Sequence, residues 1–124
     1  MNNLKIEGNN FIPSIEMDPK GFIKIEGKSY PENSYEFYKP VIDWLNEYFK
    51  NPANDTEVIF NMDYFNSTTS KVFYDIFDIL EENKDKTNLH ITWFYKNETM
   101  KECGEDFKED FEDLNIELKE KVDK

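Results

Sequence analysis

The sequence predicts a single α/β domain in which one mixed β-sheet packs against helices. The N-terminal third alternates apolar and polar residues, as antiparallel strands do. Beyond it, strand-like and helix-like segments take turns, which is typical of parallel strands joined by right-handed crossovers. A length of 124 residues suits one domain, residues 1–124. We therefore expect four or five strands, an antiparallel hairpin followed by parallel strands, and about three helices.

The first strands are indicated by alternation. The alternating segments are residues 4–7, 15–17 and 22–26. A Pro/Gly turn at residues 18–21 is expected to join the last two into a hairpin. Gly27 is expected to end the second strand of that hairpin.

A helix is expected over about residues 29–50. Ser29 precedes Glu32 by three residues, as in a capping box, and Pro31 would fall in the first turn, where its missing N–H is harmless. An apolar stripe follows at helical spacing, made by Phe37, Val41, Leu45 and Tyr48. Pro40 removes a backbone hydrogen bond within this run, so a kink or a break into two pieces is expected just before it.

The remaining elements alternate in type along the chain. They are a strand over residues 58–64, a helix through residues 73–80, a strand over 89–95, an acidic helix over 99–111 and an edge strand at residues 116–118. Residues from about 119 to 124 are strongly charged and are expected to form a frayed tail.

Composition argues against several classes of function. Fifteen Lys and Arg against 27 Asp and Glu give a net charge of −12, which opposes binding to nucleic acid or to an anionic membrane surface. No apolar run approaches the roughly 20 residues that span a bilayer. The single cysteine cannot form an intrachain disulfide, as is usual in a reducing compartment. We therefore expect a cytoplasmic protein.

Few residues suit catalysis or metal binding. His90 is the only histidine and has no acidic neighbour to orient it, so a structural role is favoured over a small hydrolase or transferase. Cys103 lies in an acidic stretch, which raises rather than lowers a thiol pKa. One helix face would carry Glu102, Glu105, Asp106, Glu109 and Asp110, and a solvated surface explains it better than a metal site. No catalytic residue, metal or cofactor is expected.

Four consecutive hydroxyl residues, Ser67, Thr68, Thr69 and Ser70, stand between a predicted strand and a predicted helix. One interpretation is an ordinary helix cap, with Asn66 or Ser67 as the N-cap residue of a constitutive interaction scaffold. A cap needs only one such residue. The other interpretation is a phosphorylation site, because a helix N-terminus favours a phosphate and accommodates its added charge of about −1.5 to −2.

The sequence also resembles a known family, the SiaC-like regulatory phosphoproteins of bacteria. The resemblance covers nearly the whole chain. The segments that carry it are "IPSIEMDPKGFIKIEG", "IEGKSYPENSYEFYKPVIDWLNEY", "FNMDYFNSTTSK" and "ITWFYKNETMKECGEDF". It implies a fold like the STAS domains of anti-sigma-factor antagonists. It also implies a non-enzymatic binding protein.

The resemblance further implies partner switching in c-di-GMP signalling. A protein kinase of anti-sigma-factor type would phosphorylate the chain, a PP2C-type phosphatase would reverse the modification, and the unphosphorylated form would bind and activate a diguanylate cyclase. The acceptor would be Thr68, with Thr69 next and then Ser67 and Ser70. The implied partner-binding residues are Tyr64, Phe65, Asn66, Ser67, Thr68, Thr69 and Lys71.

Overall fold

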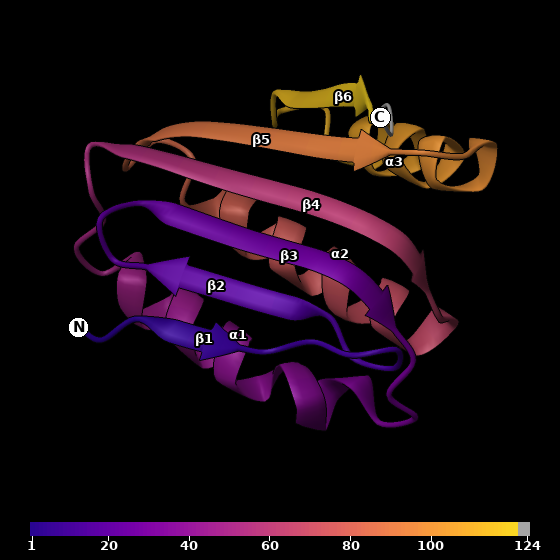
Figure 1. Ribbon diagram of the computed structural model, residues 1–124. Coiled ribbons are helices and arrows are strands. Elements are labelled where there is room, and N and C mark those ends of the chain that lie inside the picture. The colour runs from indigo at the N-terminus through magenta and orange to yellow at the C-terminus, as the bar shows by residue number, and fades with distance from the viewer. Residues whose placement is uncertain (122–124) are drawn as a thin grey trace.

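The computed structural model describes residues 1–121, which form one six-stranded sheet and three helices (Figure 1). The strands are β1 (Leu4–Ile6), β2 (Ser14–Asp18), β3 (Phe22–Ser29), β4 (Asp55–Phe65), β5 (Asn88–Tyr95) and β6 (Ile116–Glu120). The helices are α1 (Ser34–Tyr48), α2 (Ser67–Glu82) and α3 (Glu98–Asp110). The predicted mixed α/β fold is confirmed, with six strands in place of four or five.

The order of strands across the sheet is the order along the chain. β1, β2 and β3 pair antiparallel, whereas β3 through β6 pair parallel. Each helix joins two neighbouring parallel strands, and right-handed crossovers that progress in one direction place their helices on one face. Figure 1 shows the helices together behind the sheet, so the other face of the sheet is open.

The core lies between the sheet and the helices and is rich in aromatic rings. Strand residues alternate between the two faces, so every second side chain points toward the helices. Phe60 of β4 stacks on Trp93 of β5 and on Phe77 of α2, with ring centroids 5.4 and 5.0 Å apart. All three residues are fully buried. This packing fixes α2 across the middle of the sheet.

The predicted start of the first helix is wrong. α1 begins at Ser34, and its N-cap is Asn33, whose side chain accepts a hydrogen bond from the Glu36 amide at 3.2 Å. Ser29 is instead the last residue of β3, paired with Phe65 of β4. The local capping-box pattern is overridden because the chain gains a further length of sheet pairing.

Pro40 does not divide the first helix. α1 is one continuous helix with Pro40 inside it, so of the two predicted effects, a kink or a break, the break is wrong. Buried side chains on both sides of the proline, Tyr38 and Val41 among them, hold the two turns in the core. Burial of this apolar face offsets the loss of one backbone hydrogen bond.

Gly27 does not end β3. Its φ of +114° lies in the region that favours glycine, and the register shifts between Gly27 and Lys28 as at a β-bulge. The strand then continues to Ser29. The bulge therefore allows β3 to carry Ser29 as far as the carboxyl end of β4.

The C-terminal strand runs further than predicted. β6 includes Lys119 and Glu120, which the sequence had placed in a frayed tail. Residues 122–124 of that predicted tail lie outside the described residues. Within residues 1–121, no helix has both the length and the apolar character needed to cross a bilayer.

α3 lies close against β5 and β6 because it carries a glycine at the contact. A Cβ atom added to Gly104 would lie 2.5 Å from side-chain atoms of Leu118 and Trp93. The Trp93 indole N–H donates to the carbonyl of Met100 at 2.9 Å. Gly104 thus lets the helix approach Trp93 closely enough for this buried hydrogen bond.

Candidate functional site: hydroxyl groups at the start of α2

The candidate site lies at the carboxyl ends of β3 and β4, where α2 begins. Asn66 is the N-cap of α2, and its side-chain oxygen accepts the Thr69 amide at 2.9 Å. The Asn66 amide donates to the carbonyl of Ser29 at 3.1 Å, and its side-chain Nδ2 donates to the carbonyl of Pro31 at 3.0 Å. Of the two predicted cap residues, Asn66 holds the position, and it also ties α2 to the segment after β3.

Five hydroxyl groups from three elements form a continuous series, which we call the hydroxyl chain. Its members, in order, are Tyr38, Ser29, Thr69, Ser34 and Thr68. The successive oxygen–oxygen distances are 2.9, 2.8, 3.0 and 2.7 Å. The chain links the end of β3 and the start of α1 to the first turn of α2.

The direction of the hydrogen bonds follows from the ends of the chain. Burial raises the pKa of Tyr38 well above its ordinary value, so its phenol keeps its proton and can donate it to Ser29. At the other end, Thr68 donates to acceptor-only oxygens, the Asn66 side chain at 3.0 Å or the Pro31 carbonyl at 3.3 Å. Ser29 then donates to Thr69 and Thr69 to Ser34. The Ser34 proton is shared between Thr68 Oγ1 at 2.7 Å and the Pro31 carbonyl at 3.2 Å, so every member of the chain has a partner.

The four candidate acceptor hydroxyls differ in exposure. Ser67 is exposed, Thr68 and Ser70 are half-buried, and Thr69 is fully buried. The Thr69 hydroxyl lies between Ser29 and Ser34 inside the hydroxyl chain. Thr68, one residue earlier, lies at the end of that chain, where the interior meets solvent.

The other predicted partner-binding residues divide between surface and core. Tyr64 and Lys71 are exposed. Phe65 is only 8% exposed, and its ring packs against Phe73 at 5.0 Å and Trp93 at 6.0 Å. The surface around Thr68 therefore offers Tyr64 and Lys71, while Phe65 anchors the end of β4.

Three further exposed aromatic residues lie near this site. Tyr30 stacks on Tyr64 with centroids 4.9 Å apart, and Phe11 meets the Tyr30 ring edge-on at 6.4 Å. Tyr35, beside Ser34 at the start of α1, is 51% exposed. No local pattern marks them, because the pairing of β3 with β4 brings Tyr30 to Tyr64. A contiguous exposed aromatic surface of this kind is common at protein–protein interfaces.

The sequence also raised three other candidates: His90, Cys103 and the acidic residues of α3. The structure does not bring them together in one site. His90 is exposed on β5, in register with Glu57 of β4. Burial, and then the carboxylates of Asp106 and Glu102, raise the pKa of the half-buried Cys103 thiol. Among residues 1–121, no group of three or more His, Cys, Asp or Glu side chains is arranged to hold a metal ion. The acidic residues of α3 are exposed on its outer face.

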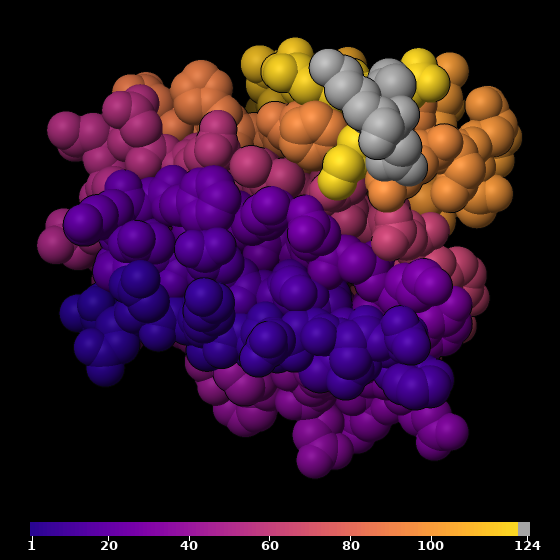
Figure 2. Space-filling view, viewed as in Figure 1, coloured from indigo at the N-terminus to yellow at the C-terminus, as the bar shows by residue number. Residues whose placement is uncertain are grey.

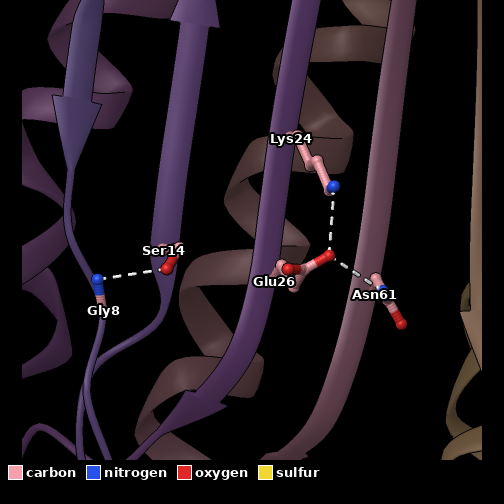
Figure 3. A network of polar contacts seen from close by, with 5 residues as sticks. All are labelled: Gly8, Ser14, Lys24, Glu26 and Asn61. Atoms are coloured by element: carbon pink, nitrogen blue, oxygen red, sulfur yellow. Dashed lines mark hydrogen bonds and ion pairs between the residues drawn. The ribbon is translucent and has the colours of Figure 1, made fainter.

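The open face of the sheet carries a separate polar network (Figure 3). Glu26 lies between the Lys24 ammonium at 3.1 Å and the Asn61 side-chain amide at 3.0 Å. Burial alone would raise the pKa of Glu26, but the hydrogen bonds from Lys24 and Asn61 lower it below its ordinary value. A shallow hollow of about 450 Å³ adjoins this network, on the face that Figure 2 presents. Of the charged side chains that line it, Lys24 and Glu26 pair with each other.

Known proteins resemble this chain over nearly its full length. The family model described as SiaC family regulatory phosphoprotein matches residues 6–121. A protein of Pseudomonas aeruginosa strain UCBPP-PA14, described as uncharacterized, is 35% identical over 114 residues, which are 89% of this chain and 90% of that protein.

Solved structures agree with this match. Apo-SiaC from Pseudomonas aeruginosa is 31% identical, with a TM-score of 0.83 over 98% of this chain and 100% of that one. A chain in the crystal structure of the diguanylate cyclase SiaD in complex with its activator SiaC, from the same organism, is 32% identical, with a TM-score of 0.86 over 95% and 99%. Sequence and fold therefore agree over nearly the full length, and the chain belongs to the SiaC family of regulatory phosphoproteins.

Proposed function

We propose that this chain is a non-enzymatic binding protein of the cytoplasm that is switched by phosphorylation of Thr68. A protein kinase of anti-sigma-factor type adds the phosphoryl group, and a PP2C-type phosphatase removes it. The unphosphorylated form binds and activates a diguanylate cyclase. The observation that carries the proposal is the position of Thr68, at the solvent end of the hydroxyl chain in the first turn of α2.

The geometry favours Thr68 over its neighbours as the acceptor. The Thr69 oxygen is enclosed between Ser29 and Ser34, so a kinase could reach it only after the first turn of α2 opened. Ser67 is exposed but lies outside the hydroxyl chain as the first residue of the helix. Thr68 is half-buried and already fixed in orientation by Ser34 and Asn66.

The surroundings of Thr68 also suit a protein partner. Tyr30, Tyr64 and Tyr35 are exposed around it, and exposed aromatic side chains are frequent binding anchors. A phosphate on Thr68 would place about two negative charges beside these rings. Burying that charge against an apolar partner surface is costly unless the partner supplies cations. Modification would therefore weaken a complex that the unmodified surface forms.

The proposal of a diguanylate cyclase as partner rests on the similarity to SiaC of Pseudomonas aeruginosa. The SiaC chain that this protein resembles at a TM-score of 0.86 is described as the activator of the diguanylate cyclase SiaD and is crystallised in complex with it. The likeness covers 95% of the present chain, which includes β3, β4 and α2. We extend that relationship to the present protein.

Mass spectrometry of the protein isolated from its native cells tests the modification. Intact-mass and fragment spectra are expected to contain one phosphate, located on Thr68. The matched variants are Thr68→Ala and Ser67→Ala, of which only the first should abolish it. A phosphate found solely on Ser67 or Ser70 would overturn the site, and its absence under every growth condition would overturn the switch.

Co-purification tests the partner. Tagged Thr68→Ala protein, which cannot be modified at that position, is expected to retain a diguanylate cyclase from native lysate and to raise its activity when both are purified. Recovery of cyclase with protein carrying phosphothreonine at position 68, in equal yield, would contradict the switch. The His90→Ala variant serves as the control. His90 lies on β5, outside the candidate site, so its loss should leave cyclase binding unchanged.

A further inference from the structure

The carbonyl oxygen of Pro31 is shared by three donors at the candidate site. Asn66 Nδ2 lies 3.0 Å from it, Ser34 Oγ 3.2 Å and Thr68 Oγ1 3.3 Å. Pro31 belongs to the turn between β3 and α1, and Tyr30, which precedes it, stacks on Tyr64. The turn is thus tied to α2 by side chains rather than by backbone pairing.

Counting protons shows how much of this tie depends on Thr68. Two hydroxyl protons, those of Thr68 and Ser34, serve the Asn66 side-chain oxygen, the Pro31 carbonyl and each other. A phosphate ester at Thr68 leaves that oxygen without a proton and adds three acceptor oxygens. Only the Ser34 proton then remains for the same acceptors and for the phosphate.

Asn66 cannot compensate by turning its amide group. Its oxygen caps α2 by accepting the Thr69 amide, and its nitrogen binds the Pro31 carbonyl. A rotation that offered the nitrogen to the phosphate would break both hydrogen bonds. The Ser34 hydroxyl, 2.7 Å from Thr68 Oγ1, is therefore the nearest group that can donate to the phosphate, and in doing so it leaves Pro31.

We propose that the turn formed by residues 30–34 responds to the state of Thr68: phosphorylation draws the Ser34 hydroxyl from the Pro31 carbonyl to the phosphate. Asn66 Nδ2 then remains as the donor to that carbonyl, and the turn loosens together with the exposed Tyr30. This regulation rests on the proposed function, because it takes Thr68 as the modified residue. Phosphorylation would then change the conformation of the turn as well as the charge at Thr68. The surface that changes includes the Tyr30–Tyr64 stack, which lies beyond the modified residue itself.

Hydrogen exchange of single amides tests the release of the turn. The phosphate is installed during translation as phosphothreonine at position 68, so no kinase is needed. The reporters are the amides of Tyr30 and Phe37, which bond the carbonyls of Phe11 and Asn33. We expect them to exchange at least about tenfold faster than in unmodified protein, while the Asn88 amide, at the opposite end of the sheet, stays within about twofold.

Phosphoserine at position 67 is the matched control. It adds the same charge one residue earlier in the same helical turn, but Ser67 is exposed and makes no contact in the hydroxyl chain. The reporter amides should respond to phosphate at position 68 and not at 67. Equal acceleration by both, or by neither, would overturn the proposal. Such a result would not bear on whether Thr68 is phosphorylated in cells, because mass spectrometry of the native protein tests that separately.

A second measurement isolates Ser34. A donor to the charged form lowers the pKa of a phosphate, so the second pKa of phosphothreonine 68, followed by phosphorus NMR, should rise on Ser34→Ala. The same variant should leave the pKa of phosphoserine 67 unchanged. If Ser34→Ala moves neither value while circular dichroism shows the fold intact, Ser34 is not the donor and the proposal fails.

Discussion

The hydroxyl oxygens of Ser29 and Thr69 lie 2.8 Å apart, although 40 residues separate them along the chain. Both side chains are fully buried. Ser29 ends β3 and Thr69 lies in the first turn of α2, so this hydrogen bond fixes the start of the helix to the sheet independently of the apolar core. Thr68 is thereby held in one orientation at the surface.

Replacing Thr69 with valine should destabilise the fold more than the same change at Thr68. Valine keeps the shape but leaves Ser29 and Ser34 with one partner fewer in a buried place, at a cost of about 1 to 3 kcal/mol. At the half-buried Thr68, water can replace the lost partner, and we expect less than about 1 kcal/mol. Urea denaturation of the two variants measures the difference. Equal losses would show that the hydroxyl chain adds nothing at Thr69.

A permanent negative charge at Thr68 should weaken capture of the cyclase. For Thr68→Asp we expect at least about a tenfold rise in Kd, equal to about 1.4 kcal/mol, because the carboxylate would be buried beside the exposed tyrosines. Ser67→Asp, one residue away and exposed, is the control and should change the Kd less. Isothermal titration with the purified cyclase gives both values, and an equal loss in the two variants would argue for general charge repulsion.

Gly104→Ala should loosen the contact between α3 and the sheet. The added methyl group would meet Trp93 and Leu118, and overpacking of this kind costs about 1 to 3 kcal/mol. Tryptophan fluorescence should shift to longer wavelength as the hydrogen bond from Trp93 to Met100 is disturbed. Cys103→Ala, the neighbouring half-buried position, should leave the emission unchanged. An unshifted spectrum for Gly104→Ala would contradict the prediction, because the contact between α3 and Trp93 would then be undisturbed by the methyl group.

Alkaline pH should destabilise the protein partly through Tyr74. Its hydroxyl donates to Asp110 at 2.6 Å, and this hydrogen bond, with burial, raises the pKa of Tyr74 from 10.0 to about 12. A pKa that is higher in the folded state contributes stability that is complete below the unfolded value and is lost as the pH rises through the folded one. The urea midpoint should therefore fall between about pH 10 and about pH 12.

Two variants separate Tyr74 from the other tyrosines. Tyr74→Phe removes the titrating group, and Asp110→Asn keeps a hydrogen-bond acceptor but removes the charge. Both should flatten the decline of the urea midpoint over this range. If the decline is as steep in both variants as in the original protein, another group is responsible.

The sequence predicted the elements whose signal is local. Strand alternation and the helical spacing of Phe73, Ile76, Phe77 and Leu80 depend only on near neighbours, and the structure buries these four side chains in one helix face. A cap at Asn66 or Ser67 was predicted for the same reason, and Asn66 holds it. Locally encoded features of this kind survive in the fold when no longer-range pairing competes with them.

Ser29 and Gly27 show where local patterns fail. A capping-box pattern at Ser29 and a glycine signal at Gly27 both indicated the end of β3. Pairing of Lys28 with Tyr64 and of Ser29 with Phe65 extends the strand past both signals. The meeting of Ser29, Ser34 and Thr69 depends on that pairing, so no stretch of sequence marks it. The hydroxyl chain therefore had to be seen in three dimensions.

The agreement between strand order and chain order has a consequence for how the molecule is made. Each segment that leaves the ribosome finds its neighbour already at the growing edge of the sheet, and no later strand must insert between two earlier ones. Nearest-neighbour pairing also keeps contacts local, which favours fast folding. The site at Thr68 is assembled once α2 has been synthesised, so a nascent chain of about two thirds of the full length already holds β3, α1, β4 and α2.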